Sequence, residues 1–304
     1  ENYGPSKQIS TILGTAYDPE SFVGSEIADV EKVEIRISSG VGANTKYWDG
    51  QYWVTTSSWL VVTGIAPFSY PAPQWRDGTY FTIEARAYDF AGNLSNYTTH
   101  TFLWDETIPV SNITFPNQMY TNSVTYFSGT AEDALGYGGN ASGLEKVEVA
   151  ISSGNLWYNW QTQSFSLSYA SWTQVSSGQT SWTHNWNIPS WDTNVLYVVY
   201  SSATDNSGNS QVVVSSFGFV FDTSKPTTKL LNPAEGWSAK NSLPQISGTA
   251  QDNNPGKIQR VEIRVQRPDH PMTPWYNRGT DSWENITSEQ AWFVADSTVS
   301  NHIV

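Results

Sequence analysis

The chain has 304 residues, no cysteine and a net charge of -13, which excludes a disulfide framework and thiolate metal sites and makes nucleic acid an unexpected partner. Charged residues make up 14 % of the chain, well below the roughly 25 % of an average soluble domain, so the surface is predicted to be polar but mostly uncharged. No run approaches the roughly 18 apolar residues of a membrane-spanning helix, and no membrane insertion is expected in this segment.

An internal repeat organises the sequence. Three motifs recur in the same order at spacings between 115 and 119 residues, which predicts three β-domains, each of the size of a single sandwich, over residues 1–105, 106–222 and 223–304. The motifs are G-T-A-x-D from Gly14, Gly129 and Gly248, A-x-D-x-x-G-N from Ala87 and Ala203, and D-x-x-x-P from Asp105 and Asp222.

Repeat one, residues 1–105, is predicted to contain four long strands. Polar and apolar residues alternate in them, as in a sheet with one buried face, so that Val33, Ile35 and Ile37 point inward while Glu34 and Arg36 point outward. A tryptophan-rich meander of short edge strands and loops follows the second strand, and A-x-D-x-x-G-N forms the turn between the last two. The predicted strands cover residues 9–16, 32–38, 80–88 and 97–104, and the meander covers residues 47–75.

Repeat two, residues 106–222, holds the complete pattern, and its polar tract 161–179 is predicted to be part strand and part loop. The strand predicted over residues 111–115 has no counterpart in repeat one, whose first strand is therefore missing. Repeat three, residues 223–304, lacks the C-terminal strands around A-x-D-x-x-G-N, and we expect the sequence to be a window of a longer repeat protein. No helix of normal length is predicted. The other strands predicted in repeat two cover residues 124–131, 145–152, 181–187, 195–204 and 211–221.

These motifs resemble the bacterial Ig-like tandem repeats of large extracellular and cell-surface proteins of the adhesin, surface-layer or filament type. The resemblance covers the whole chain and implies an all-β fold of tandem Ig-like antiparallel β-sandwiches on an extracellular or cell-surface protein. Only three residues separate Asp105 from Pro109, and three separate Asp222 from Pro226. Because linkers this short make neighbouring domains abut, a rod-like array is expected.

Six aspartates recur at fixed places in successive repeats and are candidate calcium ligands. In arrays of Ig-like domains, carboxylates at strand ends near the linker can bind calcium, which takes six to eight oxygen ligands. The alternative is that each carboxylate caps its turn by accepting hydrogen bonds from backbone N–H groups. The six residues are Asp18, Asp89, Asp105, Asp133, Asp205 and Asp222.

The tryptophans of the meander allow two interpretations. Flat aromatic faces can stack on sugar rings, which makes the meander a candidate carbohydrate site. Large aromatic residues also suit strands and cores, and tryptophans at similar places in all three repeats favour this packing role. The residues of the carbohydrate alternative are Trp48, Trp53, Trp157, Trp160 and Trp275.

No catalytic or cofactor-binding motif occurs in the chain, and its four histidines sit at unrelated places in the repeat. We therefore predict a non-enzymatic structural segment of a stalk, surface layer or filament; the alternative is an adhesin or carbohydrate-binding module. The expected partners are other copies of the chain, joined through open sheet edges by strand donation, or other cell-surface proteins, or glycans.

Overall fold

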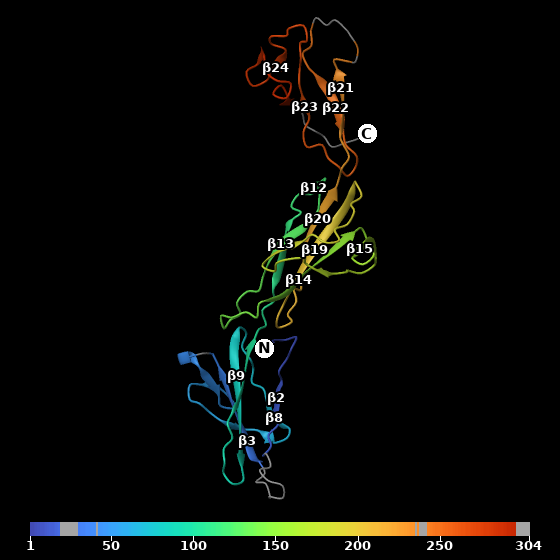
Figure 1. Cartoon of the computed structure of the whole chain (residues 1–304). Helices are drawn as coiled ribbons and strands as arrows, with labels where there is room; N and C mark the ends of the chain where they lie inside the picture. Colours follow the sequence, from blue (N-terminus) through green and yellow to red (C-terminus); the bar gives the residue numbers. More distant parts are fainter. Residues whose placement is uncertain (19–29, 41, 235, 237–241, 296–304) are drawn as a thin grey trace. The chain divides into compact units, whose positions relative to one another are not determined.

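The computed structural model describes residues 1–18, 30–40, 42–234, 236 and 242–295, and its regular structure is almost entirely β (Figure 1). The one helical segment in these residues is a 3₁₀ turn, η1 (Gly42–Asn44). None of the helical structure in the described part of the chain is long and apolar enough to cross a membrane. The predicted all-β fold is therefore confirmed.

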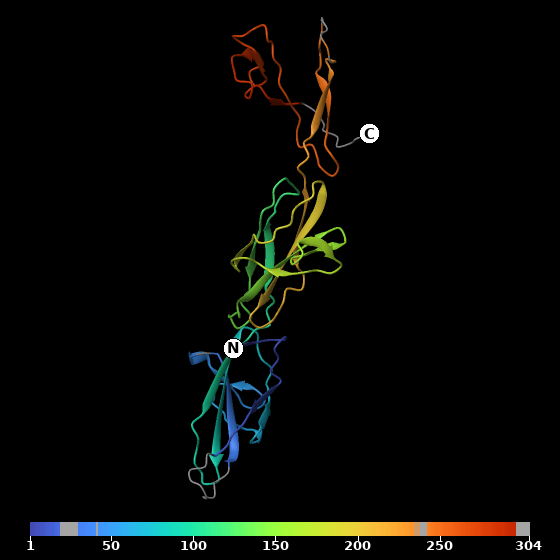
Figure 2. The same cartoon turned by 45° about the vertical axis from the view of Figure 1, so that its right-hand side comes forward.

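Repeat one folds into a β-sandwich, here called sandwich one. Its strands are β1 (Asn2–Tyr3), β2 (Thr11–Gly14), β3 (Val30–Ser39), β4 (Lys46–Trp48), β5 (Trp53–Val54), β6 (Leu60–Val61), β7 (Thr63–Gly64), β8 (Phe68–Pro71), β9 (Thr79–Asp89) and β10 (Thr98–Trp104). The larger sheet has the order β1-β10-β9-β3-β4-β5, with β6 also paired to β3, and the smaller sheet has the order β2-β8-β7. The long antiparallel β3–β9 pair forms the centre of the larger sheet (Figure 2).

Repeat two folds in the same way into sandwich two. Its strands are β11 (Val110–Phe115), β12 (Tyr120–Thr121), β13 (Phe127–Glu132), β14 (Leu144–Ser153), β15 (Leu156–Asn159), β16 (Ser164–Leu167), β17 (Thr173–Gln174), β18 (Ser181–His184), β19 (Val195–Asp205) and β20 (Ser215–Phe221). The larger sheet has the order β12-β20-β19-β14-β15-β16, with β17 on β14, and the smaller sheet has the order β11-β13-β18. The shared strand order confirms tandem Ig-like sandwiches, and β11 is the strand that sandwich one lacks in the described residues.

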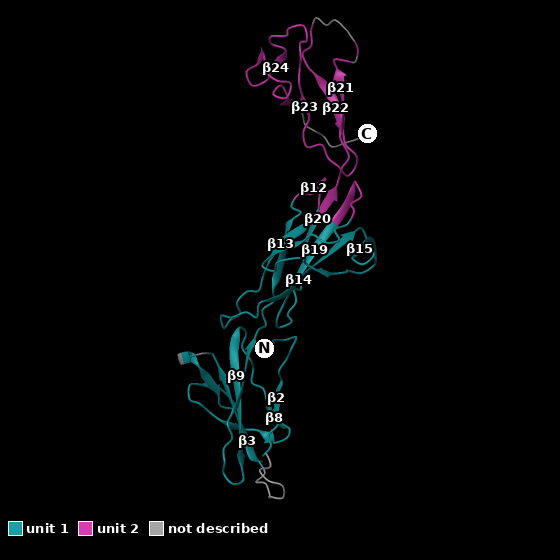
Figure 3. Ribbon diagram, in the orientation of Figure 1, with its two compact units in different colours: residues 1–117, 125–189, 198–217 teal, residues 118–124, 190–197, 218–304 magenta. Residues whose placement is uncertain are grey.

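Repeat three contributes three two-stranded sheets in the described residues. Its strands are β21 (Thr227–Asn232), β22 (Ser247–Gln251), β23 (Glu262–Ile263), β24 (Trp275–Asn277), β25 (Ser282–Glu284) and β26 (Phe293–Val294). β21 pairs with β22, β23 with β26, and β24 with β25. By residue contacts the chain divides into two compact units, residues 1–117, 125–189 and 198–217, and residues 118–124, 190–197 and 218–304 (Figure 3). Sandwich one and most of sandwich two thus belong to one unit.

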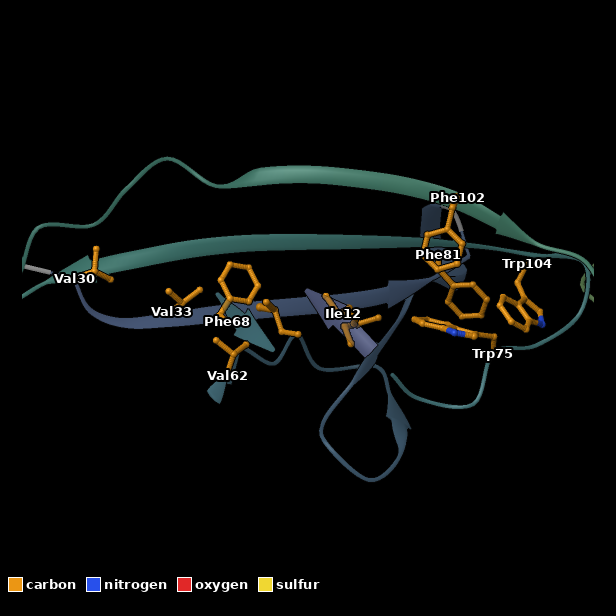
Figure 4. Close-up of a cluster of buried hydrophobic side chains, with 11 residues drawn as sticks. Ile12, Val30, Val33, Val62, Phe68, Trp75, Phe81, Phe102 and Trp104 are labelled. Atoms are coloured by element: carbon orange, nitrogen blue, oxygen red, sulfur yellow. The ribbon is translucent and has the colours of Figure 1, made fainter. Parts of the chain in front are cut away.

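The cores of the two sandwiches repeat one aromatic arrangement. In sandwich one, Trp75 packs edge-on against Phe81 and Phe102, with ring centroids 4.8 and 5.1 Å apart (Figure 4). In sandwich two, Trp191 packs in the same way against its neighbours, at 4.8 Å from Tyr197 and 5.3 Å from Phe219. Such edge-to-face pairs add stability beyond the apolar area that they bury.

The glycine of G-T-A-x-D has a packing reason in both sandwiches. Gly14 lies opposite Phe68 across the β2–β8 pair, and Gly129 lies opposite Trp182 across the β13–β18 pair. A Cβ on Gly129 would approach the Asn112 carbonyl oxygen to 2.0 Å and the Trp182 ring to 2.2 Å. The glycine of the motif thus leaves room for the aromatic ring that lies over the strand, because it has no side chain.

We expect Gly129→Ala to destabilise sandwich two by about 1–3 kcal/mol, because an added methyl group in a packed site forces the ring or the backbone to move. Urea unfolding measures the loss. The exposed neighbour Thr130 provides the control, since Thr130→Ala should change stability by less than about 0.5 kcal/mol. Equal effects of the two substitutions would show that the ring does not constrain this site.

Several predicted strand limits differ from the structure. The strand predicted over residues 9–16 is restricted to β2 (Thr11–Gly14), and the strand predicted from Gln211 begins at Ser215. Gln211 instead turns its side chain to β11, where Oε1 accepts a hydrogen bond from Ser111 N at 2.8 Å. Glu34 lies on the outward face of β3 as predicted, with Arg86, but it is only 8 % exposed, because Arg86 covers it and stacks on Trp59 at 3.8 Å.

Candidate functional site

The structure brings three of the six candidate aspartates together. Asp105, Asp133 and Asp205 each place a carboxylate oxygen within 4.8 Å of the other two, and we call them the junction cluster. Asp105 follows the last strand of sandwich one, Asp133 follows β13, and Asp205 ends β19. The cluster therefore joins the end of one repeat to two strand ends of the next.

The turn A-x-D-x-x-G-N positions Asp205 in the junction cluster through hydrogen bonds. Asp205 Oδ1 accepts hydrogen bonds from Ser207 N and Asn209 N, both at 2.8 Å. The Asn209 amide donates back to Asp205 Oδ2 at 2.8 Å and also to the carbonyl oxygen of Asp105 at 3.0 Å. One side chain of the motif thus holds both the turn of sandwich two and the linker from sandwich one.

Backbone amides hold the other two carboxylates. Asp105 accepts a hydrogen bond from Thr107 N at 3.0 Å and one from Ser142 N at 2.7 Å, one on each of its oxygens. Asp133 Oδ2 accepts a hydrogen bond from Gly143 N at 2.7 Å. These carboxylates therefore cap turns by accepting hydrogen bonds from backbone N–H groups. The capped carboxylates still lie close to one another.

Burial makes this arrangement of charges costly. Asp105 and Asp205 are fully buried. Burial and the neighbouring charge of Asp105 raise the pKa of Asp133 to about 6. Burial also raises the pKa of Asp205, although the hydrogen bonds from Asn209 oppose the shift. Carboxylates that lose water and repel one another are stabilised by a cation between them.

The oxygen atoms of the junction cluster suit a hard cation. Asp133 Oδ1 is buried without a hydrogen-bond partner, and so is the hydroxyl of the fully buried Ser207 on the adjoining turn. Calcium binds carboxylate, carbonyl and hydroxyl oxygens rather than nitrogen or sulfur. Asp105, Asp133 and Asp205 are the residues that would hold it, and the unpartnered Oδ1 of Asp133 supplies a free lone pair.

The other three candidate aspartates lie elsewhere. Asp89 ends β9 at the place of Asp205, and its carboxylate caps an exposed turn through Asn93 N and the Asn93 amide, both at 2.7 Å. The hydrogen bonds from Asn93 lower the pKa of Asp89. Asp18 has the place of Asp133 in repeat one, and within the described residues neither it nor Asp89 joins a group of three acidic side chains.

Asp222 belongs to a second group of carboxylates, which it forms with Asp252. Its Oδ2, the Oδ2 of Asp252 and the carbonyl oxygen of Asn253 all lie within 3.0 Å of the position that a Cβ would take on Gly256. Asp222 and Asp252 have the repeat positions of Asp105 and Asp133. The sequence prediction omitted Asp252 from the calcium candidates, although the G-T-A-x-D motif marks it.

A second set of polar contacts, around Asp77, involves the linker between the first two sandwiches. Asp77 Oδ1 accepts a hydrogen bond from Glu106 N at 2.7 Å, and its Oδ2 accepts one from Thr107 Oγ1 at 3.0 Å. Gly138 N of sandwich two donates to the Asp77 carbonyl at 2.8 Å, and Arg76 lies 3.9 Å over the ring of Tyr137. Asp77 thus accepts hydrogen bonds from both the linker and sandwich two.

The tryptophans of the carbohydrate alternative are packed against other side chains. Trp48 and Trp53 face each other across β4 and β5 at 5.6 Å with their planes inclined by 55°, and Trp157 lies 4.9 Å from Tyr200. Trp160 is 7 % exposed, and Arg264 covers Trp275 at 5.1 Å. All five side chains are at least partly buried, and this arrangement favours packing over a flat sugar-binding platform.

Comparisons with known proteins give similarities at low identity. No protein-family model matches the chain, and no curated protein matches it. The fibronectin(III)-like modules of Clostridium thermocellum CbhA are 12 % identical, with a TM-score of 0.33 over 73 % of this chain and 89 % of theirs. The FN1–FN3 domains of chicken CNTN1 are 12 % identical, with a TM-score of 0.29 over 63 % of this chain and 57 % of theirs. A 1.5-MDa bacterial ice-binding adhesin is 11 % identical, with a TM-score of 0.31 over 76 % of this chain and 66 % of that structure.

Proposed function

We propose that the chain is a non-enzymatic structural segment of an extracellular repeat protein, in which calcium stiffens the junction between neighbouring sandwiches. The observation that carries the proposal is the junction cluster, where carboxylates from both repeats lie within 4.8 Å of one another. Asp222 and Asp252 have the repeat positions of Asp105 and Asp133, which supports the same role for two of the three carboxylates at the next junction. A junction stiffened in this way would suit a stalk, a surface layer or a filament.

Calcium at the junction cluster would act on stiffness rather than on chemistry. Asp105 lies on the linker side, whereas Asp133 and Asp205 lie on sandwich two. A cation shared by the three would oppose their mutual repulsion and resist separation of the linker from the sandwich. Because the unfolded chain does not hold the three carboxylates together, binding adds to the stability of the folded state.

We expect calcium to raise the melting temperature of the chain, because a ligand at about 100 times its Kd stabilises the folded state by about 2.7 kcal/mol. Scanning calorimetry in millimolar calcium and in chelator measures the shift. Asp133→Asn should remove it, since the amide loses the charge that attracts the cation. Asp89→Asn, at the turn of sandwich one that is equivalent to the turn of Asp205, is the control and should keep it. An equal melting temperature in calcium and in chelator would leave turn capping as the role of the cluster.

A further inference from the structure

One histidine of sandwich two lies in its core. His184 ends β18 and is 1 % exposed, whereas the side chains of His100 and His270 are 55 % and 58 % exposed. Successive side chains of a strand point to opposite faces, so His184 turns inward on the same side as the fully buried Trp182, two residues before it. A group that titrates near neutral pH is thus kept away from water.

Aromatic rings pack against the His184 imidazole. The ring of Phe127, its partner across β13 and β18, lies almost parallel to it with centroids 6.5 Å apart, and the Trp160 ring meets it edge to face at 5.1 Å. Tyr158 packs edge to face on the same Trp160 at 5.0 Å. Burial raises the pKa of Tyr158, so this second titratable group beside Trp160 stays neutral wherever a histidine titrates.

The imidazole of His184 has no partner that would stabilise a charge on it. Its Nδ1 lies 3.4 Å from the Ser176 hydroxyl, and its Nε2 is buried without a hydrogen-bond partner. None of the ion pairs among the described residues includes His184. Because an imidazolium donates from both nitrogens, protonation would bury a charge with one N–H unpaired, which is costly.

A buried, uncharged imidazole makes stability depend on pH. Burial lowers the pKa of His184 below its ordinary value of 6.5, although the backbone at Trp186 and Gln174 opposes the shift. Because the unfolded chain then takes up the proton more readily, the free energy of unfolding falls as the pH falls below about 6.5. Asp133 acts in the opposite sense: burial and the charge of Asp105 raise its pKa to about 6, so the stability that it contributes falls as the pH rises toward about 6. The effect of His184 is therefore the part that disappears with its side chain.

The strand that carries His184 is an outer strand of the smaller sheet. β18 pairs with β13 on one side, and on the other side Thr183 and Ser177 exchange two backbone hydrogen bonds, at 2.9 and 3.0 Å. Ser176, next to this bridge, lies against His184 Nδ1 and accepts a hydrogen bond from Asn185 N at 3.1 Å. These few bonds at the edge lie beside the imidazole, so they are the first that a charge on it would break.

We propose that His184 is a pH-sensitive switch in sandwich two: a proton on its imidazole releases β18 from the smaller sheet and uncovers Trp182. The switch lies within sandwich two and is independent of calcium. Sandwich one has Tyr70 at this place, two residues after Phe68 as His184 is two residues after Trp182, and both Phe68 and Trp182 lie opposite the motif glycine. Tyrosine takes up no proton in this pH range, so the switch at this position belongs to sandwich two.

Amide hydrogen exchange and histidine NMR of the whole chain, in chelator between about pH 7.5 and about pH 5, test the proposal. We expect the imidazole of His184 to titrate below 6.5. The protection factor of the Thr183 amide should fall by up to about tenfold per pH unit below about 6.5, because opening takes up one proton. Amides of β19, at the centre of the larger sheet, should lose less protection, since β18 opens without them. A pKa of His184 at or above its ordinary value would overturn the proposal, and so would an equal loss of protection in β18 and β19.

Variants at position 184 separate the imidazole from every other group that titrates. His184→Tyr introduces the residue of sandwich one, and His184→Gln introduces a smaller neutral side chain. In both variants the loss of Thr183 protection toward low pH should disappear, whereas His100→Gln, which removes an exposed histidine, should keep it. If Thr183 protection falls in both position-184 variants as it does in the parent, another group causes the opening and the proposal is wrong. The titration and exchange of the parent chain decide the question even where a variant does not fold.

Discussion

Replacing Trp182 by alanine should destabilise sandwich two by about 3–5 kcal/mol, the range for large aromatic residues removed from a core. Trp182 is fully buried on β18, an outer strand of the smaller sheet, opposite Gly129. Its indole N–H also donates to the Thr130 carbonyl at 3.3 Å. The substitution removes the ring from above a glycine, so no neighbouring side chain is available to fill the space on that strand.

Urea unfolding followed by circular dichroism measures the loss in Trp182→Ala. Trp186, four residues further on, provides the control because its side chain is 62 % exposed. Trp186→Ala should change the free energy of unfolding by less than about 0.5 kcal/mol. A loss below about 1 kcal/mol for Trp182→Ala would contradict the packing of an aromatic ring over the glycine, which both sandwiches share.

The repeat motifs predicted the fold because they mark local structure. Alternation of polar and apolar residues depends on each strand alone, so the limits of β9 and β19 were predicted to within one residue. The strand at residues 9–16 was predicted too long, since alternation does not show where a partner strand ends. The burial of Glu34 could not be predicted from alternation either, because Arg86 and Trp59, which cover it, lie elsewhere in the chain.

The candidate calcium site was predicted only as a set of positions. Each motif marked its aspartate. The sequence could not show that Asp105 of one repeat lies close to Asp133 and Asp205 of the next, because this contact depends on the backbone path of the linker. Ser142 and Asn209, which hold the cluster through hydrogen bonds, carry no signal of metal binding in the sequence. Asp252 did carry a signal, the third G-T-A-x-D motif.

Asp205→Ala should destabilise the chain by about 2–5 kcal/mol even in chelator, because it leaves the buried amides of Ser207 and Asn209 without their acceptor and each unsatisfied group costs about 1–3 kcal/mol. Asp205 is fully buried, and Asn209 is 6 % exposed, so water cannot replace the lost bonds. The Asn209 side chain also loses the contact that aims it at the Asp105 carbonyl.

The repeat supplies the matched comparison for this prediction. Asp89 accepts the same pair of bonds from Asn93, at 2.7 Å each, in a turn with the same motif, but Asn93 is exposed and water can replace the carboxylate. Asp89→Ala should therefore cost far less than Asp205→Ala, although the hydrogen bonds in the two turns are equally short. Urea titrations of both variants in chelator, with hydrogen exchange to assign each transition to its sandwich, measure the difference. Equal losses would mean that the turn itself, rather than its burial at the junction, determines the contribution of this aspartate, and the link between the motif and the fixed junction would fail.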